Sequence, residues 1–355
     1  LRVGRRPMKK TAKRLINCIL VCAILFGTVL PAYATSIGEI QENIKNHQGQ
    51  LSNINDNIAG LEDEQDLLEE EISDLDAELL NTMAEIGVLE ENIATKEADI
   101  ETTEALYEEA KEKEESPIGK KILGDLQENL KIAKEDQIPI CQDTGMAVVF
   151  LKVGQDVHFV GGNLTDAINE GVKEGYTEGY LRKSVVSDPI ERINTKDNTP
   201  AIIHTEIVGG DKVEMTVAPK GFGSENMSRV FMLKPADGIE GVKNAILTAV
   251  EDAGPNACPP MVVGVGVGGT FEKAAEMAKE ALARNTEIVP EKEWVRNLES
   301  EMLEKINKLG IGPAGLGGRV TALSVNVETY ATHIAGLPVA INICCHVNRH
   351  TSRTI

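Results

Sequence analysis

The sequence predicts a mixed α/β domain, of the α+β kind, preceded by a long α-helical coiled coil. Three observations support this fold class. Apolar residues recur at alternating steps of three and four from Ile37 to Ile100, with no intervening proline. After Glu115 the composition changes, and glycine, valine and isoleucine become frequent. From Ile138 onward, strand-like runs alternate with helical patterns, which is typical of a domain whose helices pack on sheets.

Residues 1–34 predict a Sec-type signal peptide behind a few upstream residues. Met8 is the expected start, followed by four basic residues, the apolar run "LINCILVCAILFGTVL" and the small-residue cleavage site "AYA" at 32–34. The apolar run is short for a membrane span, so a membrane anchor is the weaker alternative. Cys18 and Cys22 would leave with the signal peptide and carry no chemistry.

Residues 35–115 predict the coiled coil. This segment contains 25 acidic and four basic residues and so accounts for the net charge of −20 of the whole 355-residue chain. A 3.5-residue apolar repeat sustained over about nine heptads indicates a left-handed coiled coil, which makes self-association possible. A single solvated helix is the alternative, but it would leave the apolar stripe unburied. Because residues 116–355 are nearly balanced in charge, no basic nucleic-acid-binding surface is expected.

Residues 116–355 predict one domain. A Ser-Pro start and helical periodicity indicate a helix in "ESPIGKKILGDLQENLKIAKEDQ". The expected strands are, in order, "AVVFLKV", "DVHFV", "AIIHTEIV", "KVEMTVAP", "MVVGVGV", "VTALSVNVE" and "LPVAINICC". The expected later helices are "NLTDAINEGVKEGYTEGYL", "DGIEGVKNAILTAVEDA", "TFEKAAEMAKEALARN" and "EKEWVRNLESEMLEKINKL". About 240 residues of this kind are enough to bury a core.

Four cysteines remain in this domain, and none has the spacing of a Cys-x-x-Cys pair. Each could be a buried small apolar residue. Their surroundings favour a site instead: Cys141 opens a turn, Cys258 lies among prolines, and Cys345 begins "CHVNRH". Three thiolates on three loops suit a soft-metal centre, and an iron-sulfur cube with three protein ligands leaves one iron open. Cys344 and Cys345 should point to opposite faces of their strand, so only one of them should reach the centre.

Several motifs carry a family resemblance. They include "PICQDTGMAVVF", "GGNLTDAINEGVKEGY", "LRKSVVSDPIER", "NTPAIIHTEIV", "APKGFGSENMS", "NACPPMVVGVGVGGTFEKAA" and "HIAGLPVAINICCHVNRH". In these residues the chain resembles the α subunit of class I, iron-sulfur-dependent fumarate hydratases, a family shared with L(+)-tartrate dehydratase α. The match is collinear from about residue 104 or 116 to the C-terminus.

The resemblance implies a cofactor, a partner and a reaction. It implies that Cys141, Cys258 and Cys345 bind a 4Fe-4S cluster, and that a separate β subunit completes the active site. It implies reversible hydration of fumarate to malate, with dehydration of L(+)-tartrate as the alternative. Hydration needs an activated water, a sink for developing carboxylate charge and a proton donor, and an open iron can serve as a Lewis acid without redox chemistry.

The resemblance also implies which residues contact the dicarboxylate substrate: Gln142, Asp143, Arg182 and His333, with the turn at residues 221–223 close to the ligand. Arg182 offers a bidentate fork for a carboxylate. Asp143 suits proton transfer, and His333 suits a hydrogen bond to the substrate. Taken by itself, Asp143 could also be a turn residue, Arg182 a surface cation and His333 a core imidazole.

Two glycine-rich stretches allow more than one interpretation. Gly264, Gly266 and Gly269 match a dinucleotide-binding spacing. No further βαβ units follow, so we expect a helix start that holds an anion or packs against a strand. The stretch "GIGPAGLGGRV" at 310–320 could cradle a carboxylate through its backbone N–H groups or could be a plain loop.

The two halves of the chain predict different compartments. The N-terminal 115 residues resemble the start of a secreted cell-wall hydrolase in their organisation, whereas a solvent-open iron-sulfur cluster requires the reducing cytoplasm. We therefore expect a cytoplasmic hydratase part and hypothesise a fusion, or an assembly chimera, joined near residues 100–116. The alternative function is that of a secreted coiled-coil wall factor with an inactive C-terminal fragment.

Overall fold

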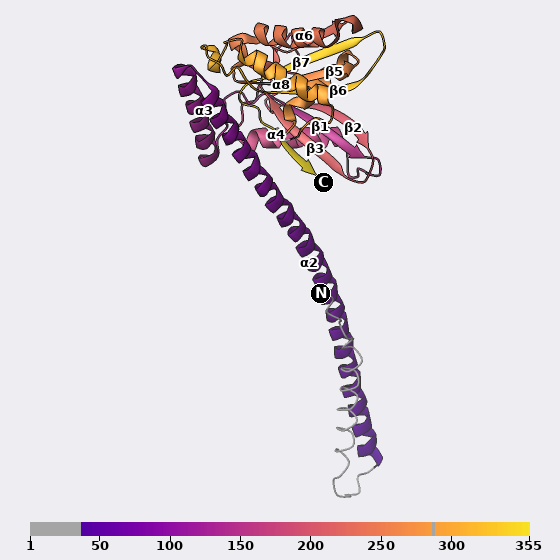
Figure 1. The fold of residues 1–355 in the computed structure, drawn as a ribbon. Helices are drawn as coiled ribbons and strands as arrows, with labels where there is room; N and C mark the ends of the chain where they lie inside the picture. The colour runs from indigo at the N-terminus through magenta and orange to yellow at the C-terminus, as the bar shows by residue number, and fades with distance from the viewer. Residues whose placement is uncertain (1–36, 286–287) are drawn as a thin grey trace. The chain divides into compact units, whose positions relative to one another are not determined.

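The computed structural model describes residues 37–285 and 288–355, apart from the side chains of residues 37, 70 and 76–104 (Figure 1). The chain divides into two compact units, residues 1–89 and residues 90–355. The predicted signal peptide lies outside the described residues. Among the helices that the structure describes, none is both long enough and apolar enough to cross a bilayer.

Helix α2 (Ile37–Lys113) occupies the segment for which the heptads predict a helix. Its apolar stripe is exposed in the described part: Ile40, Ile44, Leu51, Ile54, Ile58, Leu61, Leu68, Ile72 and Leu75 are between 41% and 64% exposed. The helix is confirmed. The coiled coil requires a second helix against this stripe and stays a prediction.

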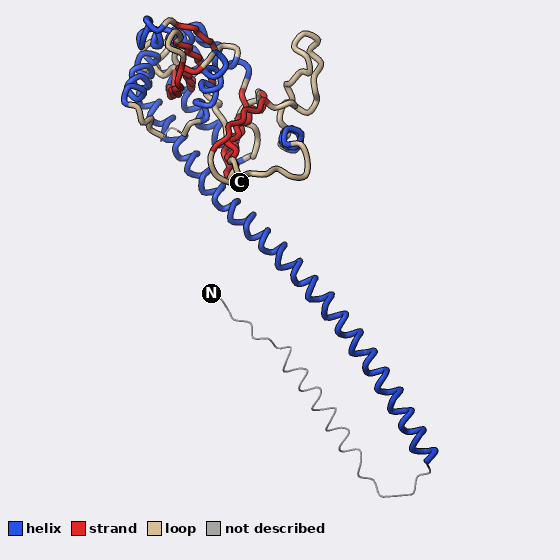
Figure 2. Tube along the Cα trace, turned by 90° about the vertical axis from the view of Figure 1, so that its right-hand side faces the viewer, coloured by secondary structure: helices blue, strands red, loops and turns tan. Residues whose placement is uncertain are grey.

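The second unit contains two four-stranded mixed sheets, as expected for an α+β domain (Figure 2). The first sheet has the order β2-β1-β3-β8 and consists of β1 (Met146–Gly154), β2 (Ile202–Val208), β3 (Val213–Lys220) and β8 (Thr351–Thr354). β1 and β2 run parallel, and the other pairs are antiparallel. One face of β1 packs against helix α4 (Leu164–Glu178), where Val149 and Leu151 meet Tyr176.

The second sheet has the order β4-β7-β5-β6 and consists of β4 (Arg229–Leu233), β5 (Met261–Gly269), β6 (Ala322–Thr332) and β7 (Leu337–Cys344). The main core lies where this sheet packs on α6 (Gly238–Ala253) and α8 (Glu293–Asn307). Helix α7 (Phe271–Glu280) packs on β5 and β7 through Ala274, Ala278 and Ala340. Helix α3 (Pro117–Glu135) begins as predicted, because the Ser116 side chain accepts the Gly119 N–H at its start.

One predicted strand is absent from the structure, and two observed strands were not predicted. "DVHFV" (156–160) is not a strand, because the Asp156 N–H donates to Gly210 and the Val157 N–H donates back to Gly154, which turns the chain away from the sheet. Strands β4 and β8 were not expected. Each lies at the edge of its sheet and pairs with a single neighbour. β4 is a run of only five residues with alternating exposure, and β8 consists of four exposed polar residues, so neither has the length and burial of a central strand.

The dinucleotide-like glycines serve helix packing. A Cβ added to Gly264 would lie 2.0 Å from the Ala278 carbonyl oxygen, and one added to Gly266 would lie 2.1 Å from that of Ala274. These glycines therefore let α7 lie directly on β5. This confirms the expectation that the motif packs a helix against a strand.

Glu114, just beyond the end of α2, occupies the other glycine-rich stretch. Its side chain is 1% exposed, and its carboxylate accepts the Arg319 N–H at 2.9 Å and the Val320 N–H at 2.7 Å, as well as the N–H groups of the two residues that follow it. Gly318 has a φ of +126°, and a Cβ there would lie 2.6 Å from the Glu114 Oε1. Of the two interpretations of this stretch, the structure shows the carboxylate cradle, and it holds a carboxylate of the chain itself.

Replacing Glu114 with glutamine should destabilise the domain by about 2–3 kcal/mol at neutral pH, because an amide N–H₂ would face backbone donors. Burial of the carboxyl raises its pKa, but the backbone N–H donors outweigh burial and leave the pKa below its ordinary value. A lowered folded-state pKa contributes stability above the ordinary glutamate pKa, and this stability is lost as the pH falls through the folded-state pKa. The difference between variant and wild type, measured by urea unfolding, should therefore shrink in acid.

The matched control is Glu115→Gln, at a neighbouring glutamate whose side chain is 76% exposed and pairs with Arg319. A surface ion pair contributes little, so this variant should unfold close to wild type at every pH. A Glu114→Gln deficit that stays constant from neutral to acid pH would contradict the proposed charge effect.

Candidate functional site

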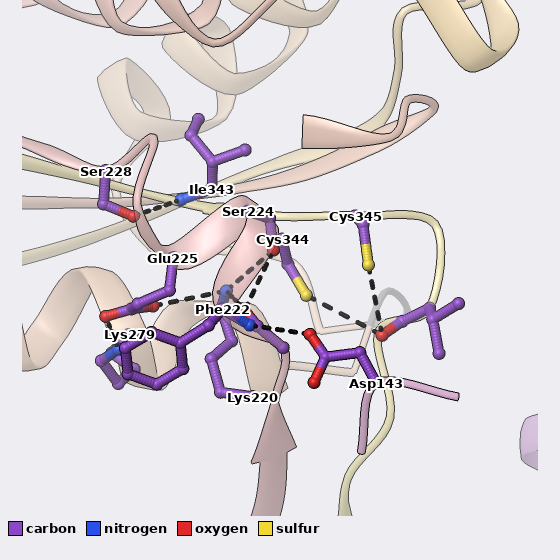
Figure 3. A network of polar contacts seen from close by, with 12 residues as sticks. Asp143, Lys220, Phe222, Ser224, Glu225, Ser228, Lys279, Ile343, Cys344 and Cys345 are labelled. Carbon is purple, nitrogen blue, oxygen red and sulfur yellow. Dashed lines mark hydrogen bonds and ion pairs between the residues drawn. The ribbon is translucent and has the colours of Figure 1, made fainter. Parts of the chain in front are cut away.

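The turn before β1 places three predicted site residues together. Asp143 uses both carboxylate oxygens: Oδ1 accepts the Gly145 N–H at 3.0 Å, and Oδ2 accepts the Phe222 N–H at 3.1 Å. The first bond closes the local turn, and the second joins this turn to the segment that follows β3 (Figure 3). Gly145 has a φ of +65°, and a Cβ there would lie 2.1 Å from the Lys220 carbonyl oxygen. Glycine is therefore required for this turn to approach β3.

The Arg182 segment is tied to the same turn by its backbone. The buried Thr144 hydroxyl donates to the Arg182 carbonyl at 2.8 Å, and the Tyr176 hydroxyl donates to the Thr144 carbonyl at 2.8 Å. Asn198 is fully buried and completes the link: its amide donates to the Gly145 carbonyl at 3.0 Å, while its carbonyl oxygen accepts the Ser184 N–H at 2.7 Å. The backbone of the Arg182 segment is thereby anchored to the Asp143 turn, and Arg182 itself is exposed.

Cys258 and Cys345 are neighbours although 87 positions separate them in the sequence. The Cys258 carbonyl accepts the His346 backbone N–H at 3.3 Å and lies 3.1 Å from the His346 Nδ1. Cys258 is exposed and has a left-handed backbone with a φ of 51°, at the end of the short helix before β5. Cys258 is therefore exposed to solvent and lies beside the end of β7.

Cys141 belongs to the same group of thiols. Burial raises the pKa of Cys258, and the charges of Cys345 and Cys141 raise it further. The Arg349 guanidinium, four residues after Cys345, donates to the Asp143 carbonyl and so joins the C-terminal tail to the turn of Cys141. All three cysteines are free thiols.

The vicinal pair does not follow strand alternation, because β7 ends at Cys344. The sulfur atoms of Cys344 and Cys345 lie 4.0 and 3.9 Å from the same carbonyl oxygen, that of Val347 (Figure 3). Cys344 is 3% exposed and packs with Val262 and Leu282, whereas Cys345 is half-buried. Cys344 and Cys345 therefore differ in burial, and not in the face of the strand to which their side chains point. Contact with Cys344 lowers the pKa of the Cys345 thiol.

The donor set is of the chemical type that an iron-sulfur cluster requires. Among the described residues, no three His, Cys, Asp or Glu side chains lie close enough to hold one metal ion. A cube of four irons and four sulfides keeps its thiolate ligands farther apart than one ion does, and thiolates are the ligands it requires. Three accessible free thiols on three separate loops fit such a group.

His333 is not brought to these thiols. It lies in the exposed loop between β6 and β7, where its Nδ1 accepts the Ala335 N–H at 3.2 Å. Cys345 follows the other end of β7, which has eight residues, so strand length alone separates the two by roughly 25 Å. Gln142 is exposed on the turn, with its Oε1 3.4 Å from the Cys141 sulfur.

Sequence reasoning missed the residues that join these segments: Thr144, Tyr176, Asn198 and Lys220. Thr144 and Asn198 lie in quoted motifs, but their contacts run to residues 38 and 53 positions away, which no local pattern indicates. For Lys220 the sequence shows only a lysine between a strand and a Gly-rich turn, and its burial is visible only in the structure.

The comparisons with known proteins fit this site. Residues 91–354 match the family model of fumarate hydratase (Fumerase). A Methanocaldococcus jannaschii protein, provisionally named L(+)-tartrate dehydratase subunit alpha, is 46% identical over 254 residues, which cover 70% of this chain and 89% of the relative. The L(+)-tartrate dehydratase subunit alpha of Escherichia coli K12 is 31% identical over 243 residues, which cover 67% of this chain and 80% of the relative.

These similarities first define a class: the protein is an enzyme of the hydro-lyase kind. More particularly, the chain belongs to the fumarate hydratase (Fumerase) family. The family match begins within α2, and Tyr107 and Ala110 of that helix pack with Leu123 and Val320. The end of α2 is therefore part of the packed domain.

Proposed function

We propose that this chain is the α subunit of an iron-sulfur hydro-lyase that reversibly hydrates fumarate to malate. The observation that carries the proposal is the junction of the Asp143 turn with the Arg182 segment and the tail after Cys345, which gathers acid, cation and thiols. L(+)-tartrate is the alternative substrate, because the two relatives carry the name of that dehydratase. Both substrates are C4 dicarboxylates, and a few contacts decide between them.

In this proposal Cys141, Cys258 and Cys345 hold a 4Fe-4S cluster. When bound, the cluster supplies a Lewis acid that polarises the oxygen added to or removed from the substrate. The thiols are free, and keeping them so requires a reducing compartment. We therefore assign the hydratase part to the cytoplasm.

The chain's own residues bind the substrate and move the proton. Arg182 faces solvent on an anchored segment and offers two parallel N–H donors to one substrate carboxylate. Asp143 is fixed by two backbone N–H donors, which orient its carboxylate for proton transfer without closing it to solvent. Gln142 beside it can donate a hydrogen bond to the substrate hydroxyl or carboxylate.

A β subunit completes the enzyme in this proposal, since both relatives are named as alpha subunits. The test is anaerobic reconstitution of the full chain with iron and sulfide, mixing with a family β subunit, and assay on fumarate, malate and L(+)-tartrate. We expect activity only in the mixture. An iron-loaded mixture that is inactive on all three compounds would overturn the proposed function, and the ratio of kcat/KM values assigns the substrate.

The proposed contact of His333 with substrate requires a second copy of this chain, because β7 separates His333 from the thiols. Mixing two inactive variants, His333→Asn and Asp143→Asn, tests this. A shared site would regain up to about a quarter of wild-type activity through wild-type combinations at mixed interfaces. No recovery on mixing would remove His333 from the site.

The exposed stripe of α2 supports self-association as a coiled coil. Sedimentation of the full chain should show an oligomer that Ile54→Asp dissociates, and an unchanged mass in that variant would refute the coil.

Three further proposals concern the same N-terminal part of the chain: the signal peptide, the function as a secreted wall factor, and the fusion. Long reads of the genomic DNA that show two separate genes would establish a chimera joined near residues 100–116.

A further inference from the structure

Lys220 is a buried cation that none of the proposed roles uses. It is the last residue of β3, its side chain is only 6% exposed, and it lies directly before the turn that reaches Asp143. Its ammonium folds back over that turn and donates to the Gly221 carbonyl at 3.2 Å and to the Ser224 hydroxyl at 3.0 Å. Figure 3 shows Lys220 beneath the short helix α5 (Phe222–Glu225), on the same side as Asp143.

The Gly221 carbonyl and the Phe222 N–H belong to one peptide group. A peptide group is planar and trans, so its C=O and its N–H point in opposite directions. Lys220 holds the carbonyl side, and the Asp143 Oδ2 accepts the N–H side at 3.1 Å. The Gly221 carbonyl also accepts the Glu225 N–H at 3.3 Å and the Ser224 hydroxyl at 3.4 Å. Rotation of this peptide group would break these bonds together with those of Lys220 and Asp143. A cation on the carbonyl also polarises the peptide group and strengthens its N–H as a donor.

The ammonium is itself held in place. Glu225 Oε2 lies 3.3 Å from the Lys220 Nζ, is buried, and accepts no hydrogen bond within the described part of the chain. Its other oxygen pairs with Lys279 of α7. Burial raises the pKa of Glu225, but the two ammonium groups outweigh burial and lower it, so the carboxylate stays charged. Lys220 therefore has a fixed counter-charge and a fixed position.

We propose that Lys220 is a positioning residue of the candidate site: its ammonium holds the Gly221–Phe222 peptide group so that the Phe222 N–H faces the Asp143 carboxylate. The role of Asp143 in turnover rests on the proposed function. The structural coupling of Lys220 to Asp143 through one peptide group does not.

The coupling is tested on the full chain without cluster or partner, by hydrogen exchange at the Phe222 amide. Lys220→Met should accelerate this exchange by at least about tenfold, the value of one lost hydrogen bond to a charged group. Asp143→Ala, which removes the acceptor, sets the upper limit. Lys220→Gln, which keeps a donor without the charge, should give an intermediate rate and serves in its place if Lys220→Met fails to fold.

Lys279→Met is the matched control, because Lys279 pairs with the same Glu225 and is also mostly buried, at 19% exposure, but does not contact the peptide group. Its Phe222 amide should exchange at the wild-type rate. Wild-type exchange in Lys220→Met, or equal acceleration in Lys279→Met, would overturn the proposal.

In the assembled enzyme, Lys220→Met should lower kcat by about tenfold or more with little change in KM, because a misplaced proton-transfer group slows turnover rather than binding. Lys220→Arg should restore part of kcat, and Lys279→Met should retain it. An unchanged kcat in Lys220→Met would remove Lys220 from the site. If the wild-type enzyme is inactive on every substrate, the proposed function fails while the exchange result still stands.

Discussion

A Cys258→Ala chain, reconstituted anaerobically and combined with a β subunit, is expected to lose the cluster and at least about 10³-fold of its activity. The reason is that several kcal/mol of charge stabilisation by the metal are removed together with its ligand. Cys258 lies on a loop held by the His346 bond to its carbonyl, so the loss of one exposed sulfur should leave the fold intact. Iron content and the visible absorbance of the cluster are measured beside activity.

Cys344→Ala is the matched control. Cys344 is the immediate neighbour of a proposed ligand, but it packs against Val262 and Leu282 and is 3% exposed. This variant should bind iron like wild type and lose only a little stability from the small cavity. If Cys344→Ala loses the cluster and Cys345→Ala keeps it, the proposed ligand set is wrong.

Replacing Asp143 with asparagine should reduce kcat by about 10²–10⁴-fold, the usual contribution of a positioned acid or base. The amide oxygen can still accept one of the two backbone N–H groups that hold Asp143, so the turn should survive at a cost of about 1 kcal/mol. The iron content should not change. The measurement is kcat of the assembled enzyme at matched cluster occupancy.

Asp237→Asn is the control for this substitution. Asp237 also accepts a backbone N–H, that of Lys234 at 2.8 Å, but it lies at the start of α6 and belongs to no site. It should retain wild-type kcat. A wild-type kcat in Asp143→Asn would show that another group transfers the proton.

Much of the fold could be predicted from the sequence, because periodicity is a local property. The apolar repeat indicated α2, the Ser-Pro start indicated α3, and the central strands β5 and β7 read as continuous apolar runs. Two edge strands, β4 and β8, were not predicted, because both are short and neither is buried, whereas the longer edge strands β2 and β6 were predicted. The run 156–160 looked like a strand, and the hydrogen bonds of Asp156 and Val157 turned it into a loop.

The candidate site, like the fold, could be predicted from the sequence only in part. The sequence by itself determined the chemical groups available: thiols, a carboxylate, an amide and a guanidinium in motifs that resemble one family. It also placed Cys141, Gln142 and Asp143 on one turn. Only the tertiary structure decided which groups meet, because the joining bonds of Thr144 and Arg349 run to residues 38 and 206 positions away.

Tertiary structure likewise decided between interpretations that the sequence left open. The glycines of β5 receive α7, the stretch 310–320 receives Glu114, and His333 lies at the far end of β7 from Cys345. A side chain's role depends on its surroundings in space, and those surroundings are set when the two sheets and their helices bury their apolar faces. Local sequence records the residue type and the backbone preference, but not the partner that packing will supply.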